Sequence, residues 1–169
     1  MTLLARILAT EFTPKGNIVE KQRNYLAFQI QEAIQKLFPK SGVSAEYSLF
    51  ISIPHITIRF TLGKDKTNWA HGYDDNDAAK CHVTITYDAD GSAEVKSGSG
   101  LGLEVDTTER HRAFDMLRVP FRKQTFKDGN PDNIFKKVMK DFTAFKKLVK
   151  DNKDVVYGRD LIKDQLEVL

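Results

Sequence analysis

Two stretches of the chain alternate apolar and polar residues, and this period of two is the feature that most restricts its fold. The stretches cover about 55–62 and about 80–88. Because side chains of a strand point to opposite faces at successive residues, each stretch is predicted to be a strand with one buried face. Aromatic and β-branched residues predict a further strand over 45–53. Asp90-Gly91 is a typical two-residue hairpin turn and leads into a predicted strand over 93–96.

Helical patterns lie on both sides of these strands. Apolar residues at helical spacing predict a helix over about 18–38. Asn130-Pro131-Asp132 supplies a cap, a proline in the first turn and an acidic residue, and an apolar stripe follows over 131–150. Shorter helices are predicted over about 107–118 and over 159–167.

These elements predict one α+β domain that covers residues 1–169. We expect an antiparallel sheet of about four to five strands, with an N-terminal helix and two or three C-terminal helices on one side. The glycine-rich segment 97–102 is predicted to be a flexible break, after which the sheet resumes over 103–105. The opening residues 1–8 are interpreted as a strand or a short helix.

Composition indicates the compartment. The chain has one cysteine, Cys81, which excludes an internal disulfide and fits a reducing environment. Cys81 lies on the apolar side of its strand and is interpreted as a small core residue. No stretch approaches the roughly 18 apolar residues of a membrane span, and the start lacks the basic region of a signal peptide. We therefore expect a cytoplasmic, intracellular protein with no membrane association.

Each of the two alternating stretches carries a histidine two residues before a threonine. His55 and Thr57 share the polar face of the first strand with Arg59, and His82 and Thr84 share that of the second. Imidazoles beside hydroxyls can hold a phosphate and transfer protons on either side of it. If the strands pair with His55 opposite Thr84 and Thr57 opposite His82, the four side chains form a compact square in which cross-strand neighbours are about 5 Å apart.

The motifs His55-Ile56-Thr57-Ile58 and His82-Val83-Thr84-Ile85 resemble those of the two-histidine phosphoesterases. The resemblance covers ten residues, 54–58 and 81–85. It implies hydrolysis or transfer at a phosphodiester or cyclic phosphate, with no metal or other cofactor. One histidine would be the general base and the other the general acid, while Thr57 and Thr84 would hold phosphate oxygens. The alternative is that both motifs belong to an ordinary polar sheet face.

Positive charge is concentrated near the C-terminus. Residues 119–153 contain ten Lys or Arg and four Asp, whereas the whole chain has a net charge of only +3. Four lysines of the predicted helix 131–150 lie opposite its apolar stripe: Lys136, Lys140, Lys147 and Lys150. Such a stripe can follow a phosphate backbone. It can equally be the outer face that keeps a surface helix soluble.

The polar segment 63–79 is the longest predicted loop, and aromatic residues stand among its lysines. Lys66, Trp69 and Tyr73 are candidates for contact with nucleic acid, because aromatic rings stack on bases. Trp69 is alternatively a cover for the core. Arg59, on the polar face of the first strand, is a further candidate.

Three functions are compatible with these patterns. The favoured one is a small protein that binds nucleic acid or another polyanion through its phosphates. The second is a metal-independent phosphodiesterase that uses His55 and His82. The third is a protein-binding inhibitor or assembly subunit without catalysis. The sequence leaves open whether the protein is an enzyme.

Overall fold

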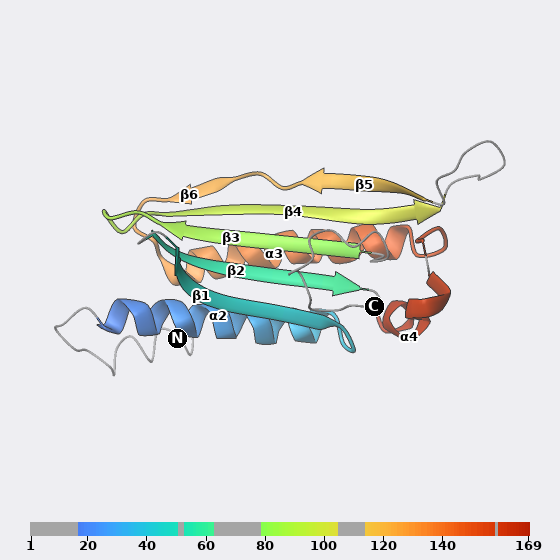
Figure 1. Cartoon of the computed structure of the whole chain (residues 1–169), viewed down its shortest axis with the longest axis horizontal. Coiled ribbons are helices and arrows are strands. Elements are labelled where there is room, and N and C mark those ends of the chain that lie inside the picture. The colour runs from blue at the N-terminus through green and yellow to red at the C-terminus, as the bar shows by residue number, and fades with distance from the viewer. Residues whose placement is uncertain (1–16, 51–52, 63–78, 105–113, 158) are drawn as a thin grey trace.

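The computed structural model describes residues 17–50, 53–62, 79–104, 114–157 and 159–169, which form a mixed α+β fold, as the sequence predicts (Figure 1). The elements, in chain order, are α2 (Asn17–Leu37), β1 (Gly42–Phe50), β2 (Ile53–Leu62), β3 (Ala79–Tyr87), β4 (Ala93–Glu104), β5 (Phe114–Pro120), β6 (Gln124–Phe126), α3 (Pro131–Asp151), the 3-10 helix η1 (Arg159–Ile162) and α4 (Lys163–Glu167). The N-terminal helix and the C-terminal helices are therefore confirmed.

The sheet is an antiparallel meander. Each of the strands β1 to β5 pairs with the next one along the chain. The short strand β6 pairs with the beginning of β4, where Phe126 is opposite Ala93. The 12-residue strand β4 therefore has β3 on one side and both β5 and β6 on the other.

The predicted break at 97–102 is wrong, because this segment is the middle of β4. Gly98, Gly100 and Gly102 occupy alternate positions on one face of the strand, while Ser97 and Leu101 are buried on the other. The alternation is present, but glycine has no side chain by which the polar face could be recognised. Hydrogen bonds to strands on both sides hold this segment extended in spite of its low strand propensity.

The predicted helix over 107–118 is also wrong where the structure describes it. Phe114–Pro120 is strand β5, and Leu117 pairs with Leu101 of β4. Isolated short helices are only marginally stable, whereas pairing with β4 supplies this segment with backbone partners. The rest of that prediction, the predicted strand end at 105 and the predicted opening element at 1–8 lie outside the described residues.

The core lies between one face of the sheet and the helices α2 and α3, which run behind the strands in Figure 1. Residues of α2, β2, β3 and α3 fill it. Four aromatic rings meet at its centre, with ring centroids 4.4 to 6.4 Å apart: Phe38, Phe60, Phe142 and Phe145. Rings at such separations add to the stability that burial provides.

Helix α3 begins where the sequence predicts. The Asn130 side chain accepts hydrogen bonds from the backbone N–H groups of Asp132 and Asn133, at 2.9 and 3.2 Å. The apolar stripe of α3, from Ile134 to Val149, is buried against the sheet. None of the described helices is both long and apolar enough to cross a membrane.

Candidate nucleic-acid interface

The two motif strands are antiparallel neighbours, but they do not have the register that the phosphate square requires. His55 pairs with Thr86, and His82 pairs with Arg59. The expected register is wrong by two residues. The two histidine positions are four residues apart along the ladder, which is about 13 Å at the usual rise of a strand. The two histidine positions are therefore not the close neighbours that the predicted square requires.

The motif residues lie on the face of the sheet opposite the helices, as their alternation predicts. Ile56 is fully buried, while His55 and Thr57 are partly exposed. Thr57 pairs with Thr84, so the two threonine positions are adjacent without a histidine pair beside them. The catalytic roles of these four residues stay a prediction.

His82 packs against the backbone of β4. It is opposite Gly98, and a Cβ atom at Gly98 would lie 3.1 Å from the His82 Cε1 atom. Burial lowers the pKa of His82 below the usual histidine value, because the charged imidazolium loses hydration there. This shift favours the uncharged form of the side chain.

A groove lined by cationic side chains lies between α3 and β6. One hollow of about 400 Å³ is lined by Gln124, Phe126, Asn133, Lys136, Lys137 and Lys140. A hollow of about 380 Å³ is lined by Arg122, Lys123, Gln124, Thr125, Lys137 and Lys140. Because the two hollows share three lining residues, they form one surface, which we call the basic groove.

A tight turn places the two walls of the basic groove side by side. The N–H group of Gly129 donates to the carbonyl of Phe126 at 3.1 Å, and Gly129 has a positive φ of 60°. The chain then enters α3 through the Asn130 cap. Since β6 is held by β4, and α3 by the core, both walls of the groove belong to fixed elements.

Five cationic side chains and no acidic side chain line the basic groove in the described part of the chain. Lys123 has a carboxylate partner at 3.7 Å, Glu94, and both side chains are exposed. For Arg122, Lys136 and Lys140 the structure shows no ion pair with any described residue. Uncompensated cations in a hollow attract anions more strongly than isolated surface charges.

Lys137 is fixed at the junction of the two hollows by a buried carboxylate. Its Nζ atom donates to Asp141 Oδ1 at 2.9 Å, and Ser97 Oγ donates to Asp141 Oδ2 at 2.5 Å. The Lys137 and Asp141 side chains are only 9% and 5% exposed. An ammonium group has three N–H donors, so its bond to Asp141 leaves donors for a ligand in the groove.

The other predicted contact residues that the structure describes do not line the basic groove. Lys147 forms an exposed ion pair with Asp151 at 2.6 Å, and Lys150 is exposed in the last turn of α3. Arg59 lies on the opposite face of the sheet, across from His82. Three further candidates lie outside the described residues: Lys66, Trp69 and Tyr73.

Half of the groove was not predicted from the sequence, because β6 was not predicted. This strand has three residues, too few for a period of two to be recognised. Gln124 and Phe126 therefore had no signal that linked them to the lysines of α3, whereas Lys137 flanks the predicted lysine stripe on the helix itself. The only available signal was the basic pair Arg122-Lys123, just before the helix start.

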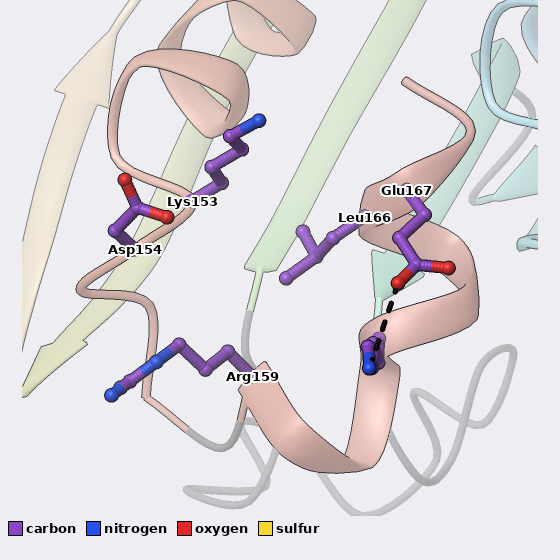
Figure 2. A pocket seen from close by; sticks show the side chains of 6 residues that line it. Lys153, Asp154, Arg159, Leu166 and Glu167 are labelled. Atoms are coloured by element: carbon purple, nitrogen blue, oxygen red, sulfur yellow. Dashed lines mark ion pairs between the residues drawn. The ribbon is translucent and has the colours of Figure 1, made fainter.

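A smaller hollow of about 280 Å³ lies between the end of α3 and α4, and its lining has mixed charge (Figure 2). It is lined by Lys153, Asp154, Arg159, Lys163, Leu166 and Glu167. Lys163 is 3.8 Å from Glu167, and Arg159 forms an ion pair with Glu104. Because carboxylates stand beside its cations, this hollow suits a polyanion less well than the basic groove.

No protein family model matches the chain, and no match is found among curated proteins or solved structures. The function is therefore inferred from the residues and their geometry.

Proposed function

We propose that this protein binds nucleic acid through its phosphates, and that the basic groove between α3 and β6 is the binding site. The observation that carries the proposal is the lining of the groove. Among the described residues, five cationic side chains and no acidic one converge there, and three of the five have no ion pair with another described residue. Clustered lysine and arginine on one face is the electrostatic footprint of nucleic-acid binding.

The distribution of the cations favours a chain of phosphates over a single small anion. Lys136 lines one hollow, Arg122 and Lys123 line the other, and Lys137 and Lys140 line both. A single anion contacts only some of these side chains. A ligand with phosphates at regular intervals can contact all of them at once.

We propose binding and no catalytic step. A phosphodiesterase of the predicted kind needs both imidazoles at one phosphate, whereas the register separates His55 from His82 by about 13 Å along the strands. The polar sheet face that carries them is opposite the face on which α3 packs.

The test is a comparison of two charge-reversal variants of equal net charge. Lys136→Glu with Lys140→Glu changes the groove, whereas Lys147→Glu with Lys163→Glu changes two lysines outside it whose side chains are 77% and 74% exposed. Affinity for a fluorescent 20-nucleotide oligomer is measured by anisotropy. We expect the groove variant to bind about tenfold or more weakly, because each reversed contact replaces attraction by repulsion. The control variant should change by less than about threefold, since screening weakens exposed charges at a distance.

Equal losses in the two variants would show that only the overall charge matters, and the groove would not be the binding site. Unchanged binding in the groove variant would reject the proposal outright. Thermal unfolding of both variants verifies that each has folded. Exposed ion pairs such as those of the control lysines contribute about 1 kcal/mol or less to stability.

A further inference from the structure

We infer that the basic groove takes single-stranded nucleic acid, with a base in the hollow that contains Phe126 and a phosphate in the hollow that contains Arg122 and Lys123. This inference rests on the proposed function and specifies its ligand. The observation behind it is that the two hollows differ in chemistry although they share Gln124, Lys137 and Lys140.

The first hollow has the groups that recognise a base. Phe126 supplies an aromatic ring, and Gln124 and Asn133 supply side-chain amides. A side-chain amide offers both a donor and an acceptor, as the polar edge of a base does. The structure shows neither amide in a hydrogen bond with a described residue, so both are available to a ligand.

Phe126 is held rigidly enough to act as a stacking platform. It pairs with Ala93 of β4, and it packs against the core while the residue stays partly exposed. Stacking on a fixed aromatic ring tolerates any base, because every base has a π-face.

The second hollow has the groups that recognise a phosphate. Arg122, Lys123 and the Thr125 hydroxyl line it, and no aromatic ring is among the described residues of its lining. Lys137 and Lys140 stand between the two hollows, and the ammonium of Lys137 is fixed there by Asp141. A nucleotide with its base in the first hollow thus has cations at the position of its backbone.

A duplex cannot use this arrangement. Its bases are paired and stacked inside the helix, so a base reaches an aromatic ring only after it leaves the stack, which is unfavourable. A duplex can therefore offer the groove only its phosphates. A single strand offers phosphates and unpaired bases together, so it should bind more tightly at the same salt concentration.

The test compares three probes with the full chain: a 20-nucleotide oligothymidine, a 20-base-pair duplex and inorganic polyphosphate of similar charge. We expect the native protein to bind the single strand at least about fivefold more tightly than the duplex. Stacking of one base on an aromatic ring strengthens binding by about fivefold or more. Phe126→Leu, which keeps an apolar side chain, should weaken single-strand binding by about fivefold to a hundredfold. It should leave polyphosphate binding unchanged.

Two further variants control this experiment. Phe28→Leu makes the same replacement at a phenylalanine of α2 that is 56% exposed, and it should change no affinity. Phe126→Tyr keeps the ring and should retain single-strand binding, so the ring can be tested even if Phe126→Leu proves unstable.

Equal affinity for single strand and duplex, or an equal loss of polyphosphate binding in Phe126→Leu, would overturn this inference. In both cases the proposed function would stand, since phosphates would still bind. If none of the three probes binds, the proposed function and this inference both fail.

Discussion

Gly129 determines how the chain passes from β6 into α3. Its φ of 60° lies in the left-handed region, which side chains disfavour. A Cβ atom at this position would also overlap the backbone oxygen of Gly91, in the turn between β3 and β4. The two turns are thus in backbone contact, and this contact places the first turn of α3 beside β6.

Gly129→Ala is expected to destabilise the protein by about 3 kcal/mol or more. The left-handed conformation alone costs an alanine about 1 to 2 kcal/mol. The overlap with the Gly91 backbone adds to this cost, because neither backbone segment can shift easily. Gly91→Ala is the matched control: Gly91 has a φ of 88°, but no atom of the described residues lies within 4 Å of its Cβ position. It should show only the conformational cost. Urea unfolding measures both, and equal losses would contradict the backbone contact.

Single residues also show which features can be predicted from the sequence and which cannot. The Asn130 cap is a local signal and was predicted correctly, because its partners are the next residues of the chain. The contact between Gly129 and Gly91 joins residues 38 positions apart, so no local pattern could reveal it. Phe126 belongs to the candidate site for the same reason, through its pairing with Ala93.

At the scale of elements, a buried ion pair within α3 is hydrogen-bonded to β4. Lys137 and Asp141 are one helical turn apart. Asp141 also accepts a hydrogen bond from the hydroxyl of Ser97, in β4. A carboxylate buried in this way is costly unless all its partners are in place. The same pair positions the ammonium of Lys137 in the basic groove, so stability and ligand binding depend on one contact.

Asp141→Leu is expected to cost about 3 to 5 kcal/mol, because it leaves the Lys137 ammonium nearly buried without a partner. The triple variant Ser97→Ala, Lys137→Met, Asp141→Leu should recover most of the loss, since apolar replacement of a whole buried network is often neutral. Both are measured by urea unfolding.

Asp151→Leu, in the exposed pair with Lys147 at the same spacing, controls for the loss of an ion pair on this helix. It should cost about 1 kcal/mol or less. A triple variant as unstable as Asp141→Leu alone would show that the unpaired ammonium is not the cause.

Long elements with a strong period were predictable, and short or glycine-rich ones were not. Helix α3 follows its predicted range 131–150 almost residue for residue, because twenty residues repeat one pattern between clear signals. Strand β4 contains three glycines at alternate positions, and β6 has only three residues. Pairing with neighbouring strands stabilises both segments. A local sequence pattern does not show which strands will be neighbours, so these two segments could not be predicted from it.

For the whole molecule, the important feature is that the helices lie on one face of the sheet (Figure 1). The lysines of α3 could be predicted as an outward stripe from helical spacing alone. Which of them form a site could not, because that depends on β6 lying next to the first half of the helix. The register between β2 and β3 likewise depends on the whole sheet, and the square of motif residues was wrong for that reason.

Binding of a single strand should weaken with salt in proportion to the phosphates that the groove contacts. Each contact contributes about −0.7 to the slope of log affinity against log salt, so three to five contacts give about −2 to −3.5. Lys136→Gln with Lys140→Gln should reduce the magnitude of this slope by about 1.4. Titrations between about 50 and 300 mM KCl measure it. Lys147→Gln with Lys163→Gln should leave the slope unchanged, and a flat native slope would be incompatible with phosphate binding.

The single thiol of the chain is enclosed between the sheet and α3. Cys81 is fully buried, and burial, with the nearby charge of Asp141, raises the pKa of its thiol well above the usual range. Only an accessible thiolate reacts, so a thiol reagent can modify Cys81 only when α3 and the sheet have separated locally. The rate at which the native protein is modified therefore records how often α3 leaves the sheet, without any label having to be introduced.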